Sequence, residues 1–235
     1  MAVESLYVEP ERDSAAVDWP ALEFLDVFKI YRSGPAETVA LRGLDVRVER
    51  GEAIAVLGPS GSGKSTFLTL AAGLDEPSAG EVRVFGRTLS RLSEPELAGY
   101  RATDLALVFQ SGNLWSALSA HENVATALRL AGREGDPDAA LATFGLGDRA
   151  HHRVDALSGG EQQRVAIAAA AARRAPLVLA DEPTGELDER NEDIVLDALV
   201  RLREVAESTV IVVTHSDRVA AAVDRVVEVR DGRAV

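Results

Sequence analysis

From residue 22 onward, short apolar runs rich in β-branched residues alternate with segments whose apolar positions recur at helical spacing. The runs that predict strands are 22–30, 44–48, 53–57, 81–85, 105–109, 177–180, 209–214 and 226–229. The segments that predict helices are 64–72, 121–130, 159–174, 192–207 and 218–222. Strands that alternate with helices are typical of a largely parallel sheet covered on both faces, so the pattern predicts an α/β fold.

Three stretches depart from this alternation. The early strands are closely spaced around Arg-Gly and Glu-Arg-Gly turns, which predicts an antiparallel β subdomain beside the parallel-sheet core. From about Ser111 to Asp155 helices occur without a convincing strand, and we therefore expect an inserted helical subdomain over about 111–165. Residues 1–20 carry proline, acidic and small residues without periodicity, which predicts a flexible extension before one domain at 21–235.

The composition narrows the possible functions. The 235 residues are 46% hydrophobic and 27% charged, which is ordinary for a globular domain with a buried core. No apolar run is long enough to cross a bilayer, and the acidic start lacks the basic and apolar regions of a secretion signal. A formal net charge of -13 repels phosphate backbones, so we expect no nucleic-acid partner. The lack of cysteine excludes disulfides and thiolate zinc sites, and it fits a reducing cytoplasm.

A glycine-rich segment directly after the strand at 53–57 carries the first candidate chemistry. It reads Gly58-Pro59-Ser60-Gly61-Ser62-Gly63-Lys64-Ser65-Thr66. It matches the pattern G-x-x-x-x-G-K-[ST], in which backbone amides turn inward around a phosphate chain. We expect Lys64 to neutralise the β- and γ-phosphates of ATP and the Ser65 hydroxyl to bind Mg²⁺. A plain glycine-rich turn is disfavoured, because the strand and the helix that the motif requires both flank it.

Two adjacent acids, Asp181 and Glu182, follow the apolar strand at 177–180. Acids often follow strands simply because solvent begins there, and alone this pair would be interpreted as solvated loop residues. In an open parallel sheet, however, ligands bind at the carboxyl ends of the strands. Together with the glycine-rich loop, the pair predicts a site in which Asp181 holds Mg²⁺ and Glu182 orients and deprotonates an attacking water.

The most discriminating segment runs from Leu157 to Arg164. Ser158 and Glu161 have the spacing of a capping box, so the segment could simply be a well-capped helix start. Each glycine weakens a helix by about 1 kcal/mol relative to alanine, and the consecutive pair at 159–160 therefore needs a further reason. Close approach of the backbone to a second phosphate group is such a reason, and two chains facing head to tail could supply it.

Together, the phosphate loop, the acid pair and the segment 157–164 resemble the nucleotide-binding domain of ABC transporters, and the likeness extends from about residue 22 to the C-terminus. The resemblance implies further roles. Tyr31 would stack on adenine, and Gln110 would sense Mg²⁺ and couple to the membrane partner. The signature residues Ser158, Gly159 and Gly160 would contact the ATP of the opposite subunit, Asp188 would be the D-loop acid, and His215 would be the switch at the γ-phosphate. The catalytic residues that the resemblance implies are Lys64, Gln110, Glu182 and His215.

Each role carried over from the family has a plainer alternative. Tyr31 could be an ordinary strand aromatic, Gln110 a surface residue and Asp188 the cap of the next helix. The order of the motifs along the chain, each at a strand or loop end, favours the functional interpretation. Of the four histidines, His215 directly follows an apolar strand, and we interpret His121, His151 and His152 as surface residues.

Within the family, the sequence is most similar to the group that serves lipoprotein release, macrolide export and the FtsE cell-division complex. The phrases that carry this likeness are those at 40–43, 72–77, 107–110, 179–188 and 229–232. The chain departs from the group at 111–115, where Ser-Gly-Asn-Leu-Trp replaces an aromatic and a proline-containing turn. This segment resembles part of the surface that faces a permease.

The resemblance implies an ATPase with ATP and Mg²⁺ as its cofactors. It also implies a homodimer or pseudo-dimer that powers separate integral membrane permease subunits from the cytoplasmic face of the plasma membrane. The cargo would be a lipid, a lipoprotein or a drug that is exported or extracted. An FtsE-like ATPase, which signals to cell-wall enzymes without transport, is the alternative. A soluble ABC protein of DNA repair or translation is disfavoured, since the chain has one ATPase unit, no cysteine and strong acidity.

Overall fold

The computed structural model describes residues 19–34, 36–185 and 187–235, so nearly all of the extension predicted at 1–20 lies outside the described residues. The strands are β1 (Leu22–Ser33), β2 (Ala36–Val48), β3 (Ala53–Leu57), β4 (Ala79–Val84), β5 (Arg87–Thr88), β6 (Leu105–Val108), β7 (Leu177–Asp181), β8 (Thr209–Thr214), β9 (Arg225–Arg230) and β10 (Arg233–Ala234). The α-helices are α1 (Lys64–Ala71), α2 (Glu94–Thr103), α3 (Ala120–Leu130), α4 (Pro137–Thr143), α5 (Gly159–Arg173), α6 (Glu189–Ala206) and α7 (Asp217–Ala221). Short 3-10 turns are η1 (Leu89–Arg91), η2 (Gly147–Arg149) and η3 (Val154–Ala156).

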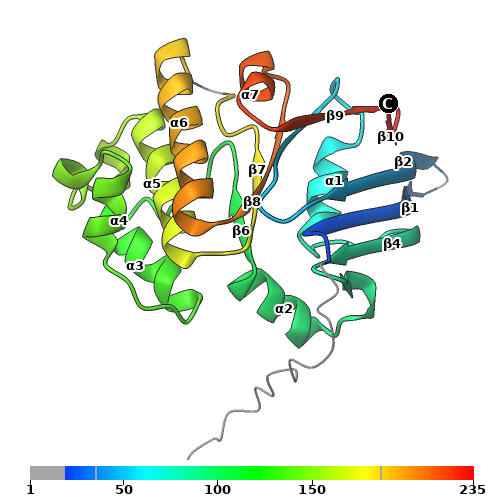
Figure 1. The fold of residues 1–235 in the computed structure, drawn as a ribbon, viewed down its shortest axis with the longest axis horizontal. Helices are drawn as coiled ribbons and strands as arrows, with labels where there is room; N and C mark the ends of the chain where they lie inside the picture. The colour runs from blue at the N-terminus through cyan, green and yellow to red at the C-terminus, as the bar shows by residue number, and fades with distance from the viewer. Residues whose placement is uncertain (1–18, 35, 186) are drawn as a thin grey trace, which may run out of the picture.

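The strands form two sheets (Figure 1). The first has the order β2-β1-β4-β5 and is antiparallel, with Leu22 of β1 opposite Val48 of β2 on one side and Val84 of β4 on the other. The second has the order β10-β9-β3-β8-β7-β6, and its strands run parallel except for β10. A parallel α/β core with an antiparallel β layer is the predicted fold class, and that prediction is confirmed.

Helix α1 lies between the two sheets (Figure 1). Its Phe67 stacks on Phe24 of β1 with ring centroids 4.5 Å apart, and it shares a buried cluster with Ile54 of β3. The next residue of β3, Ala55, points to the opposite face and joins a second cluster with α3, α5 and α6. Small side chains at 168–171 of α5 are buried in that cluster, so this helix can approach the sheet closely. The sheet is thereby covered on both faces.

The sequence pattern missed two helices, the two-residue strands β5 and β10, and the start of β2. Helix α2 buries Leu97 and Tyr100, and α4 buries Leu141, so the periodicity of an amphipathic helix is weak in both. Their starts carry clearer signals, because Ser93 forms a capping box before α2 and Asp136 caps α4. Strand β2 begins at residue 36, well before its expected start at 44, because the extra residues pair with β1 at a largely exposed end.

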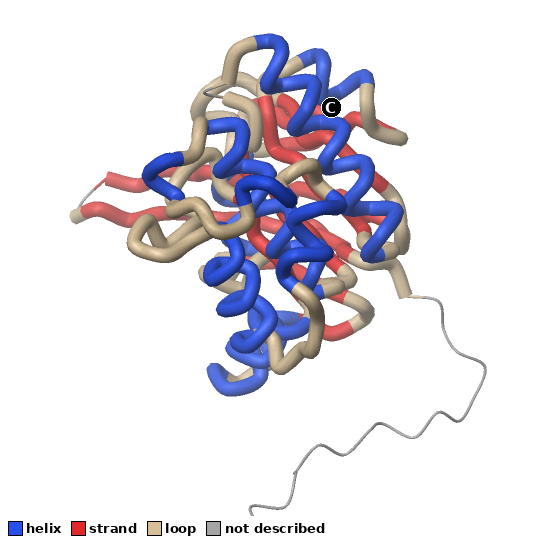
Figure 2. The backbone as a smooth tube through the Cα atoms, turned by 90° about the vertical axis from the view of Figure 1, so that its left-hand side faces the viewer, coloured by secondary structure: helices blue, strands red, loops and turns tan. Residues whose placement is uncertain are grey.

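The chain between β6 and α5 forms α3, α4, η2 and η3, and no named strand falls there. These helices and α5 lie together on the left of Figure 1, and Figure 2 shows them from that side, in front of the strands. The boundaries expected for this helical subdomain and for the whole domain stay predictions. Among the described residues, no helix combines the length and the apolar character that a bilayer crossing requires.

Candidate nucleotide site

A cavity of ≈ 620 Å³ lies at the carboxyl ends of β3, β7 and β8. Its lining includes Tyr31, Gly58, Pro59, Ser60, Gly61, Gly63, Lys64, Ser65, Thr66, Asp181, Glu182 and His215. The fold thus brings together the phosphate loop, the acid pair, the expected adenine-stacking aromatic and the expected switch histidine. Within the loop, Ser62 is buried instead, with 3% of its surface exposed.

The backbone of the phosphate loop packs closely against neighbouring protein atoms at Gly58. An added Cβ at Gly58 would lie 2.2 Å from the carbonyl oxygen of Val229 and 2.6 Å from Ser62 Oγ, so no side chain fits at this position. Helix α1 begins directly after Gly63, and no side chain caps its first amides. Uncapped amides at a helix start are available to an anion. The loop therefore fits a phosphate chain.

Lys64 supplies the cation of the loop. Its Nζ donates to the carbonyl oxygen of Gly58 at 2.6 Å and to that of Pro59 at 3.1 Å, so the ammonium group is held across the loop. These two carbonyls fix the position of the charge without neutralising it. An ammonium group held there attracts the β- and γ-phosphates of a nucleotide.

Glu182 is held in place by neighbours on β8 and just beyond it. Its Oε2 accepts a hydrogen bond from Thr214 Oγ1 at 3.0 Å, and its Oε1 lies 2.9 Å from His215 Nδ1. Its φ of 44° is in the left-handed region, which costs a non-glycine residue about 1 kcal/mol or more and is found at sites where geometry matters. The carboxylate is thus aimed into the cavity, where a general base for water would stand.

Of the three residues expected to bind or sense Mg²⁺, Asp181 and Ser65 line this cavity and present oxygen donors to it, whereas Gln110 lines another cavity. Burial raises the pKa of the Asp181 carboxyl, the negative charge of Glu182 raises it further, and Lys64 opposes the rise. A carboxylate destabilised by burial and by a like charge is stabilised by a cation beside it. The donor set therefore fits a divalent metal ion.

Tyr31 lines the same cavity on the side of the antiparallel sheet. Its hydroxyl donates to Asp75 Oδ2 at 3.2 Å, and Lys29 Nζ lies 4.9 Å from the ring centroid. The side chain is 40% exposed, which leaves ring surface for a planar base. Its position agrees with the adenine-stacking role that the family resemblance implies.

The signature residues lie outside this cavity's lining. Ser158 caps α5 with a full capping box, since its Oγ accepts from the amide of Glu161 and Glu161 Oε2 accepts from its amide. Gly160 has a packing reason of its own, because an added Cβ would lie 2.7 Å from Asn191 Oδ1. At Gly159 an added Cβ would meet only a Leu187 methyl group, at 3.6 Å, which is an ordinary van der Waals contact. Approach to a phosphate group therefore remains the expected reason for Gly159.

Asp188 performs the plainer role considered for it. Its Oδ1 accepts from the amide and the side-chain nitrogen of Asn191, at 2.9 and 2.8 Å, and so caps α6. The same Asn191 packs over Gly160. The starts of α5 and α6 are therefore joined, and an additional contact of Asp188 with nucleotide stays a prediction.

Gln110 lies in a second cavity, of ≈ 320 Å³, which Gly159 and Leu187 also line. Two residues that also line this cavity, Asn113 and Gln163, were given no individual role from the sequence. Asn113 exchanges two 2.7 Å hydrogen bonds with the backbone of Phe109, and the buried Gln163 of α5 donates to the carbonyl oxygen of Phe109 at 2.8 Å. Gln163 comes three residues after Gly160 of the signature, and this position was the only feature of the sequence that could have pointed to it. These bonds tie the end of β6 to α5.

This arrangement is that of an ATP-hydrolysing domain of the phosphate-loop class. The family model described as "ABC transporter" matches residues 41–185. The chain belongs to that family, and within it is the ATP-binding domain, as the sequence analysis predicted.

Individual relatives agree with this assignment. The chain is 44% identical over 222 residues to the "Lipoprotein-releasing system ATP-binding protein LolD" of Anaeromyxobacter dehalogenans, a match that covers 92% of this chain and 93% of that protein. It is 41% identical over 221 residues to the "Macrolide export ATP-binding/permease protein MacB" of Hyphomonas neptunium. That match covers 92% of this chain and 34% of the relative, so the chain spans about a third of the length of this MacB protein.

A solved structure agrees with the fold. The ATP-binding cassette MJ0796, in a dimeric post-hydrolysis state bound to ADP and Pi, is similar with a TM-score of 0.81 and 36% sequence identity. The likeness covers 91% of this chain and 96% of that one.

Proposed function

We propose that two copies of this chain enclose two ATP molecules between them and that ATP hydrolysis drives a separate membrane permease. One observation carries the proposal. The cavity that holds the phosphate loop is lined by Lys64, Asp181 and Glu182 of its own chain, whereas Gly159 lines another cavity. A second copy, turned head to tail, can bring its Gly159 to the open side of the phosphate loop. The dimeric cassette with ADP and Pi supports this arrangement by similarity.

In this proposal each residue has a limited task. The amides of the phosphate loop and Lys64 Nζ bind the phosphates, and Tyr31 stacks on the base. Glu182 takes the proton of the attacking water, and His215 keeps its carboxylate in position. Mg²⁺, held by Ser65 and Asp181 when bound, neutralises charge on the phosphate oxygens.

Hydrolysis then opens the pair. Before hydrolysis, one nucleotide contacts both chains through its terminal phosphate, so ATP favours the closed pair. After hydrolysis, two separate anions replace that single bridge and repel each other. The closed pair loses its link, and the opening is the mechanical step.

The permease partner is inferred from an exposed apolar surface and from the names of relatives. A cavity of ≈ 460 Å³ between α2, α3 and α5 is lined by Leu107, Trp115 and Leu130, of which Trp115 is 52% and Leu130 67% exposed. Exposed apolar groups around a groove fit a short helix of a partner. Lipoprotein release and macrolide export are the activities in the relatives' names. We therefore extend export or extraction of a lipid, lipoprotein or drug, at the cytoplasmic face of the membrane, to this chain.

If the signature contacts the nucleotide of the other copy, a change at the signature should lower ATP turnover without lowering ATP affinity. Gly159→Arg is expected to leave ATP affinity within about twofold of wild type and to lower ATP turnover at least about 100-fold, the effect of losing a donor to a reacting phosphate. The reason is that a Cβ at this position meets only a Leu187 methyl group of its own chain, at 3.6 Å, whereas the arginine side chain would block a nucleotide bound by a second copy. Calorimetry measures binding, and phosphate release measures turnover.

The control for this variant is Gly99→Arg, at an exposed position of α2 with nothing within 4 Å of an added Cβ. It should keep both activities. Equal losses of affinity and turnover in Gly159→Arg would instead mean that the signature contributes to the nucleotide site of its own chain, and the head-to-tail arrangement would be wrong.

The permease surface has a test of its own. Tagged protein purified from solubilised membranes of its own host is expected to retain an integral membrane protein. Leu130→Glu should reduce that recovery at least about fivefold, because a charge on the rim of an apolar contact costs on the order of 1 kcal/mol or more. Val205→Glu, at a 52% exposed position of α6 that lines other cavities, is the matched control. Equal recovery of a membrane protein with all three forms would place the contact elsewhere.

A further inference from the structure

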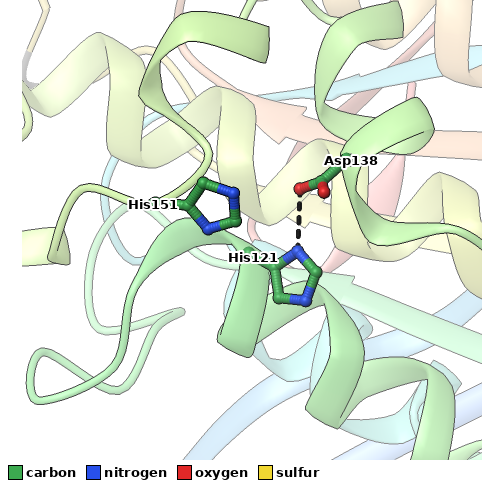
Figure 3. Close-up of side chains that lie close together, drawn as sticks. All are labelled: His121, Asp138 and His151. Atoms are coloured by element: carbon green, nitrogen blue, oxygen red, sulfur yellow. Dashed lines mark hydrogen bonds and ion pairs between the residues drawn. The ribbon is translucent and has the colours of Figure 1, made fainter.

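Three side chains with metal-binding atoms lie close together (Figure 3), and none of them lines the nucleotide cavity. His121 lies in the first turn of α3, Asp138 in the first turn of α4, and His151 in the segment between η2 and η3. Each offers one donor atom, and these atoms all lie within 4.8 Å of one another. The sequence analysis interpreted both histidines as separate surface residues, and the fold brings them together.

The backbone beneath the two histidines is fixed. The amide of His121 donates to the carbonyl oxygen of Ala150 at 2.8 Å, and the amide of Ala120 donates to that of His152 at 3.0 Å. These bonds hold the residues on either side of His151, and one of those residues, Ala150, is buried. The segment that carries His151 is thus tied to the start of α3. A site whose supporting backbone is held in this way loses little freedom when it binds a ligand.

The carboxylate of the cluster is held by α4. Asp136 caps this helix through bonds to the amides of Asp138 and Ala139, and Leu141 of the same helix is buried in the core that α3 shares. His121 Nδ1 lies 2.7 Å from Asp138 Oδ1 (Figure 3). The imidazole and the carboxylate therefore already face one another across two helices.

A simple surface ion pair explains His121 and Asp138 but not the second ring. The ring centroids of His121 and His151 are 5.4 Å apart, with an interplanar angle of 34°. Two imidazoles and one carboxylate form a common donor set for Zn²⁺, with water completing a tetrahedron. Ligands of such an ion stand about 3.4 Å apart, since each bond is about 2.1 Å long. The present separations, 2.7 Å between His121 Nδ1 and Asp138 Oδ1 and up to 4.8 Å across the cluster, lie on either side of that value.

We propose that His121, Asp138 and His151 form a site for a divalent transition-metal ion, with Zn²⁺ as the best match. The site joins α3, α4 and the segment that leads to the signature. Arg149, two residues before His151, donates to Glu161 of the signature's capping box at 3.2 Å. A bound ion would therefore brace the helical part of the molecule next to the signature. This site is independent of the proposed nucleotide chemistry, and neither proposal depends on the other.

The test is Zn²⁺ binding by the full chain without nucleotide, measured in competition with a chromogenic chelator. The wild-type chain is expected to bind one equivalent of Zn²⁺. His151→Ala and Asp138→Asn should each weaken that binding at least about 10-fold, the effect expected even for partners of metal ligands. Zn²⁺ should raise the Tm of the wild-type chain and leave that of His151→Ala unchanged. With Co²⁺ as a probe, absorption bands of a tetrahedral ion should appear in the wild type and be lost in His151→Ala.

Two further histidine variants serve as controls for the specificity of Zn²⁺ binding. His152→Ala removes the neighbouring histidine, whose Nε2 lies 3.4 Å from Arg149 and which is not in the cluster, and it should bind Zn²⁺ within about twofold of wild type. His215→Ala removes the histidine of the nucleotide cavity and should behave in the same way. Absence of Zn²⁺ binding by the wild-type chain overturns the proposal, and so does a loss in His152→Ala or His215→Ala equal to that in His151→Ala.

Discussion

The Glu182→Gln variant is expected to bind ATP as tightly as the wild-type chain and to hydrolyse it at least about 100-fold more slowly, because a general base contributes roughly 10²–10⁴-fold. Glutamine has nearly the same shape, so it can still accept the hydrogen bond from Thr214. It cannot take a proton from water. Binding is measured by calorimetry and turnover by phosphate release under saturating ATP and Mg²⁺.

The same variant should accumulate as a closed pair, because ATP holds the two copies together until it is hydrolysed. Light scattering with ATP is expected to show twice the 25.0 kDa mass of one chain, and omission of ATP should restore the single mass. Glu94→Gln, which changes a side chain that is 84% exposed on α2, is the control and should behave like wild type. Wild-type turnover by Glu182→Gln would show that another group is the base.

The Lys64→Ala variant is expected to lose ATP affinity by about 100-fold or more. The ammonium group is held across the phosphate loop by the carbonyls of Gly58 and Pro59, where it can bond to two phosphate groups. Hydrogen bonds to charged groups contribute about 1.5–3 kcal/mol each, so two of them amount to about 3 kcal/mol at least. Calorimetric titration with ATP and Mg²⁺ measures the loss.

The matched control for Lys64→Ala is Arg91→Ala, which removes a positive charge that is 74% exposed and pairs with Glu81 on the antiparallel sheet. It should keep the wild-type affinity, since overall charge is not what holds the nucleotide. Circular dichroism should show that both variants are folded. If Lys64→Ala bound ATP with unchanged affinity, the assignment of this loop as the phosphate-binding loop would be wrong.

The sequence predicted best those parts of the fold in which the residue types themselves match their burial in the structure. Strands β3 and β8 have the predicted bounds, because β3 is an apolar run and β8 an apolar run between two threonines, both buried on both faces. The phosphate loop was found from the spacing of its glycines, lysine and hydroxyl together with the strand and the helix that flank it. Helices α2 and α4 were missed because their stability comes from caps and a few long-range contacts, such as the bond from Tyr100 to the carbonyl oxygen of Ala71.

Contacts between residues distant in the sequence were beyond prediction from the chain alone. The glycine at 160 was attributed to a phosphate, and the structure gives it a second cause in the side chain of Asn191. The link from Gln163 to Phe109 joins residues 54 positions apart. The cluster of His121, Asp138 and His151 depends on how α3, α4 and the turn η2 pack, which no local pattern records.

The contact between Gly160 and Asn191 has a mechanical consequence. Because Asn191 also binds Asp188, the first turns of α5 and α6 are packed directly against each other. The short stretch from Glu182 to Asp188 joins these turns to the end of β7. In the proposed pair of copies, the signature that faces the neighbour's nucleotide would therefore be linked through this stretch to Glu182 of its own chain. A change at one ATP molecule would then be passed on to the other through the protein chain.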